Sequence, residues 1–313
     1  MSAIFHQVIP GVSVIERGWL NCNQIVLTSP DRNVLIDSGY GRHAGETIRH
    51  VAEALDNAPL HWLVNTHCHS DHMGGNRALR ECYDCRVTIP VGEVKHVVPW
   101  TAQSCWSEEM DQYAEEFEFD DTIAAGDSFD AGGLRWRAHA APGHDMDALI
   151  YFAPEAGIVV SGDALWERGL GFVWPEKNHA TDPNPYIHAA FAALDSIEKL
   201  NPKIVVPGHG APFSDVARSL ADARGKLAAL QRDPVKNARH VAKSLFVFAL
   251  LDKGEMKVGD VPAYLDSVPV YRRMRRDFLL GSNDELAARM LQELVAGKAL
   301  KVEGGLIKPT MRA

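Results

Sequence analysis

One short stretch constrains this chain more than any other: residues 66–75, which read Thr-His-Cys-His-Ser-Asp-His-Met-Gly-Gly and follow an apolar run with the length of a buried strand. In an extended segment alternate side chains share a face, so His67 and His69 point the same way, whereas Asp71 and His72 lie side by side at the turn. Neutral imidazole and carboxylate are ligands that suit zinc, with iron or manganese also fitting. Two ligand pairs on one loop can serve two adjacent ions. The alternative is a histidine-rich surface loop that binds no metal.

Three later positions share the same arrangement. In each, a short apolar run leads into a glycine-containing turn that carries a metal-type ligand, namely His144, Asp163 and His209. Singly, such residues are ordinary turn residues, but together and in this order they form a specific signal. Strand ends are rigid platforms, and flanking glycines let a cation approach the backbone closely. Asp37 ends another apolar run, and we expect it to steady the histidine loop by hydrogen bonding.

These motifs resemble those of the metallo-β-lactamase-fold superfamily. The resemblance covers roughly the first 210 to 230 residues, and it rests on LIDSG (35–39), HCHSDHMGG (67–75), APGHD (141–145), SGDALW (161–166) and PGHG (207–210). It implies an α/β (α+β) fold, a four-layer αβ/βα sandwich with metal ions at one edge of two facing sheets.

The resemblance also implies the ligands of each metal ion. One ion would be held by His67, His69 and His144, the other by Asp71, His72 and His209, and Asp163 would bridge both. Two cations about 3.5–4 Å apart lower the pKa of a shared water, and the resulting bridging hydroxide can attack an electrophilic carbon or phosphorus. Asp71 is also predicted to be catalytic, because a carboxylate there can carry the proton of the nucleophile to the leaving group.

Details of the ligand pattern narrow the chemistry. Oxygen-reducing diiron members of the superfamily have an acid where this chain has His69, and secreted β-lactamases lack the bridging acid that Asp163 supplies. Glyoxalase II-like thioesterases share the histidine motif, the bridging acid and the final histidine. They continue differently after the residue equivalent to His144, which is followed here by Asp-Met-Asp. The favoured function is hydrolysis of an ester, thioester or lactone of a small organic substrate.

Two alternative functions stay open. One is a phosphodiesterase or nuclease of the same fold, and the other is a non-catalytic metal-binding regulatory protein whose tail binds nucleic acid or a partner. The chain carries 32 Lys and Arg against 41 Asp and Glu, a formal net charge of −9. This acidic balance argues against binding to nucleic acid or to an anionic membrane.

Two segments are candidates for the walls of a substrate pocket. Residues 166–175 carry Trp166, Phe172 and Trp174 around two glycines, a composition that suits an apolar ligand site or, alternatively, anchors to the core. His179 and Tyr186 follow and can hydrogen-bond a substrate. Residues 93–121, which are rich in aromatic and acidic side chains, are either a lid over the pocket or a pair of surface helices.

The chain divides into a predicted catalytic domain, residues 1–234, and a C-terminal domain, residues 235–313. The latter has three helical segments and then a hairpin with a Gly-Gly turn, the layout of a winged-helix-like unit. We expect it to pack on the catalytic domain, to shape the pocket or to mediate a homodimer.

The sequence also bears on the cellular location. Five cysteines in so long a chain do not suggest a disulfide framework, and neither a signal-like start nor a membrane-length apolar run is evident. A cytoplasmic location is therefore expected.

Overall fold

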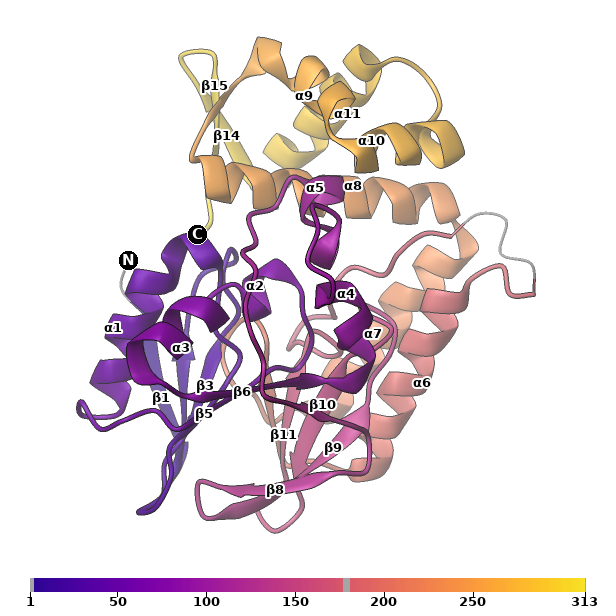
Figure 1. Ribbon diagram of the computed structural model, residues 1–313. Helices are drawn as coiled ribbons and strands as arrows, with labels where there is room; N and C mark the ends of the chain where they lie inside the picture. Colours follow the sequence, from indigo (N-terminus) through magenta and orange to yellow (C-terminus); the bar gives the residue numbers. More distant parts are fainter. Residues whose placement is uncertain (1–2, 177–180, 313) are drawn as a thin grey trace.

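The computed structural model describes residues 3–176 and 181–312, and it begins with a seven-stranded sheet in the order β1 to β7 (Figure 1). The first four strands pair antiparallel, and β4 to β7 pair parallel. Parallel neighbours need crossover connections, which here contain the helices α1, α2, α3, α4 and α5. The strands are β1 (Ile4–Ile9), β2 (Val12–Glu16), β3 (Gln24–Leu27), β4 (Val34–Ile36), β5 (Trp62–Val64), β6 (Arg86–Pro90) and β7 (Asp121–Ile123).

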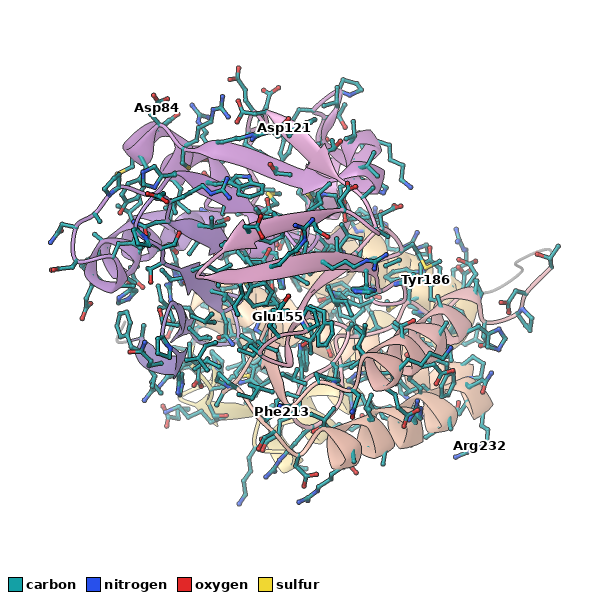
Figure 2. All side chains as sticks on the ribbon, turned by 90° about the horizontal axis from the view of Figure 1, so that it is seen from below. Asp84, Asp121, Glu155, Tyr186, Phe213 and Arg232 are labelled. Carbon is teal, nitrogen blue, oxygen red and sulfur yellow. The ribbon has the colours of Figure 1, made fainter. Side chains whose placement is uncertain are left out.

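A second sheet of five strands faces the first, in the order β12-β11-β10-β9-β8. Only its β11–β12 pair is parallel among the described strands of this sheet, with α6 in the crossover. Seen from below, the strand ends remote from the C-terminal helices face the viewer, with Glu155 in the turn between β10 and β11 (Figure 2). The strands are β8 (Ser128–Ala131), β9 (Leu134–Ala140), β10 (Leu149–Ala153), β11 (Ile158–Gly162) and β12 (Ile204–Pro207).

Alternating side chains of the strands build three apolar layers. Val14, Ile36 and Val64 of the first sheet meet Trp136 and Tyr151 of the second, all buried. The outer face of the first sheet packs under α1 (Ala44–Ala54) and α3 (Asn76–Tyr83). The outer face of the second sheet packs under α6 (Pro185–Leu200) and α7 (Val216–Arg232). The predicted four-layer αβ/βα sandwich is therefore confirmed.

Residues 93–121 do not form a pair of surface helices, which was one of the two alternatives for this segment. They contain α4 (Val94–Val97) and α5 (Ser107–Met110), each a single turn, with a 3-10 turn at Ser104–Trp106 and otherwise irregular chain between them. Cys105, Trp106 and Asp111 have φ of 52°, 56° and 54°, a left-handed conformation that interrupts a helix. The helix-pair alternative is wrong for this physical reason.

The C-terminal segment lies across one end of the sandwich (Figure 1). The predicted helices and the hairpin are present, and the turn glycines Gly304 and Gly305 have φ of 59° and 79°. The winged-helix assignment itself stays a prediction. The elements are α8 (Pro234–Lys253), β13 (Met256–Lys257), α9 (Val261–Ser267), α10 (Pro269–Met274), α11 (Asn283–Ala296), β14 (Leu300–Glu303) and β15 (Leu306–Pro309).

The core of this C-terminal segment continues into the sandwich. Phe246 of α8 and Tyr271 of α10 belong to the same buried cluster as Leu20, Tyr40 and Met110, which lie far earlier in the chain. The predicted domain boundary at residue 234 falls at the start of α8, and it stays a prediction. None of the helices in the described ranges is long and apolar enough to cross a membrane.

Phe246 provides a test of this shared core, because its side chain is fully buried. We expect Phe246→Ala to lower the free energy of unfolding by about 3–5 kcal/mol, since truncation leaves a cavity. Urea denaturation followed by circular dichroism measures the change. Leu280→Ala is the control, because Leu280 is 76% exposed. Equal denaturation midpoints for the two variants would contradict the shared core.

Candidate metal centre

The ends of several strands bring the predicted ligands to one edge of the sandwich. His67 and His69 follow β5, and Asp71 and His72 lie in α2 (Ser70–Met73), the single turn after it. On the second sheet, β11 and β12 are parallel, so their carboxyl ends meet at the same edge. Asp163 directly follows β11, and His209 comes two residues after β12. His144 lies in the connection from β9 to β10.

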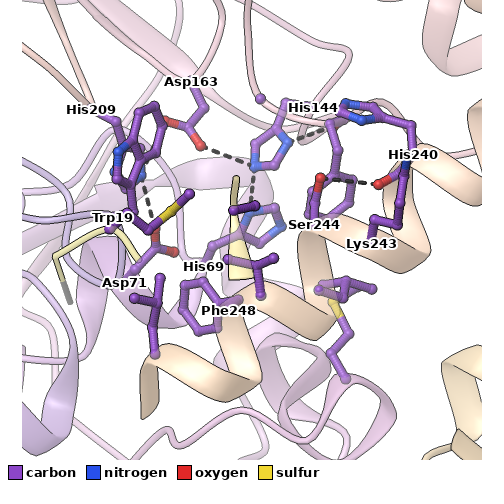
Figure 3. Close-up of a pocket in the computed structure, with 18 of the residues that line it drawn as sticks. Trp19, His69, Asp71, His144, Asp163, His209, His240, Lys243, Ser244 and Phe248 are labelled. Atoms are coloured by element: carbon purple, nitrogen blue, oxygen red, sulfur yellow. Dashed lines mark hydrogen bonds and ion pairs between the residues drawn. The ribbon is translucent and has the colours of Figure 1, made fainter. Parts of the chain in front are cut away.

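One group of candidate ligands consists of three histidines. Ligand atoms of His67, His69 and His144 lie within 4.8 Å of one another. Nδ1 of His69 is 2.9 Å from Nε2 of His144, and the latter atom is 3.3 Å from Oδ2 of Asp163 (Figure 3). Tetrahedral bonds of zinc to nitrogen or oxygen place neighbouring ligand atoms roughly 3.3 Å apart. The spacing of this group therefore fits a single bound ion.

The second group combines a carboxylate with two histidines. Nε2 of His209 is 3.1 Å from Oδ2 of Asp71, and Nε2 of His72 is 3.8 Å from the same oxygen. Oδ1 of Asp163 lies 3.4 Å from Nε2 of His72 and 3.8 Å from Nε2 of His209. The two oxygens of Asp163 thus face different groups.

The burial of the histidines suits a metal, and so do the protonation states of His67 and His69. Burial lowers the pKa of His67 well below its usual range, and the neighbouring His72 and His69 lower it further. Burial, followed by His144, lowers the pKa of His69 to about 4. Both rings are neutral at neutral pH, which is the form that binds metal. Nε2 of His67 and Nε2 of His72 are buried without a hydrogen-bond partner, an arrangement that a bound ion explains.

Asp37 lies behind the histidine loop, as the sequence predicts. Its Oδ2 is 2.8 Å from Nδ1 of His72, and its two oxygens accept hydrogen bonds from the backbone N–H and the hydroxyl of Thr66. Asp37 is fully buried and has a φ of 62°, a strained conformation for a residue with a side chain. The carboxylate therefore fixes the orientation of the His72 ring, so that Nε2 faces the second group.

Sequence reasoning missed two buried acids behind His69. Nε2 of His69 is 3.5 Å from Oδ2 of Asp145, and this contact leaves Nδ1 free to face His144. Glu93 is fully buried beside Asp145; burial, followed by the charge of Asp145, raises the pKa of Glu93 well above its usual range. The acid directly after His144 in the sequence was the available signal for Asp145.

Aromatic side chains close the other side of the centre. Nε1 of Trp166 donates a hydrogen bond to Oδ1 of Asp163 at 3.1 Å, and the ring of Trp19 stacks on His209 with centroids 5.5 Å apart. Trp166 was predicted as pocket wall, whereas Trp19 was missed. The carbonyl of Phe172 accepts a hydrogen bond from Nδ1 of His144 at 2.6 Å.

Two cavities open at the centre. The larger, of about 440 Å³, is lined by Trp166 and Phe172 among the predicted pocket residues. The smaller, of about 270 Å³, is lined by Phe172, Trp174 and Tyr186. Trp174 and Tyr186 thus lie away from the larger cavity, and His179 falls outside the described residues.

A sandwich of two sheets with histidine and aspartate clusters at its strand ends defines a class of metal-binding proteins. The model of one family, the metallo-beta-lactamase superfamily, matches residues 17–209. The chain belongs to this superfamily.

Curated relatives match a shorter part of the chain. One named hydroxyacylglutathione hydrolase, from Rhodopseudomonas palustris (strain BisA53), is 33% identical over 112 residues. Another of the same name, from Brucella ovis, is 29% identical over 112 residues. Each match covers 36% of this chain and 36% of the relative, little more than a third of either protein.

Two solved structures resemble the chain over nearly its whole length. A beta-lactamase domain protein from Burkholderia ambifaria has a TM-score of 0.57 and 22% identity, covering 99% of this chain and 94% of its own. A metallo-beta-lactamase family protein from Thermus thermophilus has a TM-score of 0.56 and 19% identity, covering 97% and 100%. At this identity the likeness establishes the fold.

Gly208 offers a test of the geometry. A Cβ atom there would lie 2.5 Å from Oδ1 of Asp163 and 2.9 Å from Cε1 of His72. We expect Gly208→Ala to displace both side chains and to reduce the zinc retained after dialysis, as measured by atomic emission. Gly225→Ala in α7 is the control, because a Cβ there meets nothing within 4 Å. Full zinc content in Gly208→Ala would be inconsistent with ligands so close to this backbone.

Trp166 offers a second test. Replacing its indole by a ring that donates no hydrogen bond, in Trp166→Phe, frees Oδ1 of Asp163 to rotate. We expect a loss of about 10–100-fold in zinc affinity, the usual effect of removing a partner that orients a ligand. Competition with a fluorescent chelator measures the affinity. Trp136→Phe, in the core between the sheets, is the control, and an equal loss there would argue against a role for the indole N–H of Trp166.

Proposed function

We propose that the protein is a dinuclear metal-dependent hydrolase that cleaves an ester, thioester or lactone bond of a small organic substrate. The observation that carries the proposal is Asp163, whose Oδ2 faces the group of His144 while its Oδ1 faces that of His72 and His209. A carboxylate shared in this way suits two adjacent cations. The relatives named hydroxyacylglutathione hydrolase support a thioester as the bond cleaved.

The donor set decides which ions fit. His67, His69 and His144 would hold one ion, Asp71, His72 and His209 the other, and Asp163 would bind both. A set of imidazole nitrogens and carboxylate oxygens suits zinc, and iron or manganese also fit. Such ions supply a Lewis acid and a water acidic enough to be a nucleophile at neutral pH.

Asp71 is the side chain best suited to handle a proton. It lines the larger cavity, and its Oδ2 is held 3.1 Å from Nε2 of His209. Burial raises the pKa of Asp71, but His72 and His209 more than offset that effect, so the pKa is below its usual value. Asp71 is therefore a carboxylate when the nucleophile must lose its proton, and it can pass that proton to the leaving group.

The alternative functions have less support. A nuclease needs a basic surface for the phosphate backbone, whereas this chain has a formal charge of −9. The wall of the larger cavity includes Phe248, Leu251 and Leu294, which suit an apolar organic group. The predicted homodimer and cytoplasmic location stay predictions.

The proposal is tested with zinc-loaded protein and four substrate classes: nitrophenyl esters, acyl thioesters of N-acetylcysteamine, lactones and a bis-nitrophenyl phosphate. We expect measurable hydrolysis of the first three classes, fastest for thioesters, and its loss in Asp163→Asn together with the bound metal. Asp71→Asn is expected to lower kcat by about 10²–10⁴ if it retains metal, because proton transfer is then lost.

His188→Ala is the control, since His188 is exposed on α6, belongs to none of the described clusters and lines neither cavity. Preference for the phosphate diester, or full metal loading without turnover of any class, would overturn the proposal.

A further inference from the structure

The two cavities at the metal centre differ in character, and they meet at the same residues. Both are lined by His69, Met110, His144 and Phe172. A substrate whose scissile bond lies at this junction therefore extends in two directions, with one half in each cavity. The polarity of the two walls then decides which half of the substrate enters which cavity.

The larger cavity lies between the metal centre and the C-terminal helices. Its apolar wall comes from three separate stretches of the chain, with Trp19 from the sandwich, Phe248 and Leu251 from α8, and Ala299 and Met311 from the end of the chain. Its volume of about 440 Å³ lies in the range of pockets that enclose a small ligand.

Two of the polar side chains that α8 contributes to this wall already have partners. Nζ of Lys243 is 2.7 Å from Oε2 of Glu293. Ser244 donates its hydroxyl to the carbonyl of His240 at 3.0 Å (Figure 3). Burial, followed by the positive charges of Lys226 and Lys243, lowers the pKa of His240 to about 3, so its ring is uncharged at neutral pH. The wall thus offers a ligand mainly apolar contacts.

The smaller cavity has charged and polar side chains in its wall, beside apolar ones such as Trp106 and Met146. Lys95 pairs with Asp147 at 2.6 Å, and the guanidinium of Arg273 lies over the ring of Trp174 and within 3.3 Å of Glu109. Tyr186 lines the same cavity. Although paired, the side chains of Lys95 and Arg273 are 62% and 41% exposed, so both can still donate a hydrogen bond to a polar group in this cavity.

We infer that the substrate is a thioester of a medium-length, apolar acyl group, whose hydrocarbon lies in the larger cavity while a polar thiol half lies in the smaller one. This inference rests on the proposed function for the bond cleaved. It adds that the C-terminal helices α8 and α11 select the acyl group.

The first experiment measures hydrolysis of N-acetylcysteamine thioesters from acetyl to decanoyl by the zinc-loaded protein. Each methylene that enters the cavity is expected to raise kcat/KM about three- to fourfold until the cavity is filled. A second series keeps the acetyl group and lengthens the thiol. A steeper dependence on the thiol than on the acyl group, or a flat acyl series, overturns the inference while leaving the proposed function intact.

Ser244→Leu tests the wall directly. The hydroxyl of Ser244 bonds the carbonyl four residues earlier in its own helix, and leucine at this position would occupy part of the cavity. We expect the preferred acyl chain to become shorter. Ser196→Leu is the matched control, because Ser196 makes the same bond to Ala192 on α6 but is exposed. Phe248→Ala, which enlarges the cavity, is expected to lengthen the preferred chain.

A binding measurement tests the larger cavity independently of hydrolysis. The fluorescence of Trp19 and Trp166 reports binding of straight-chain carboxylates, from acetate to decanoate, to the zinc-loaded and metal-free proteins. We expect affinity to rise with chain length in both proteins and to fall for the long chains in Ser244→Leu. If no thioester is hydrolysed, the proposed function fails, and this binding series alone decides on the cavity. Affinity that is independent of chain length, or equally affected by Ser196→Leu, overturns the inference.

Discussion

The position of one carboxylate, that of Asp163, determines the rest of the candidate centre. Its two oxygens face two different groups of candidate ligands. A small rotation of the side chain would therefore change the distances within both groups. Three features prevent that rotation. Trp166 donates a hydrogen bond to one oxygen, Gly208 leaves room for the same oxygen, and the parallel pairing of β11 with β12 fixes the backbone. The histidines around Asp163 keep its pKa well below the usual range despite burial, which by itself would raise it.

This arrangement is unfavourable for folding unless cations are bound. Nε2 of His67 and Nε2 of His72 are buried without hydrogen-bond partners, and Asp37 has a left-handed backbone conformation at the position from which it orients His72. Buried unpaired polar atoms and strained residues each reduce stability, and they persist where function requires them. The large apolar layers on both faces of the two sheets offset these costs.

The sequence was sufficient to predict that these candidate ligands lie close together, because most of them follow short apolar strands closely, and strand ends in a sandwich converge. Their role as metal ligands stays a prediction. The four layers were predicted from the resemblance of the chain's motifs to those of the metallo-β-lactamase superfamily, and the alternation of helices and strands is consistent with such layering. Asp145, Glu93 and Trp19 were missed because their roles depend on contacts between distant segments. The irregular course of residues 93–121 was also unpredictable, since apolar spacing gives no sign of left-handed residues such as Cys105 and Asp111.

The C-terminal helices link stability to the proposed specificity. Leu245, Val247 and Leu251 of α8 belong to the core shared with Leu20 and Met110, and the same three residues line the larger cavity. A cavity wall built from core residues is held rigid by packing, so its shape is set by the fold rather than by the ligand. It follows that changes of acyl preference should arise most easily at wall residues outside that buried core, such as Ser244. Changes at Leu251 would alter selectivity and stability together, because one side chain serves both.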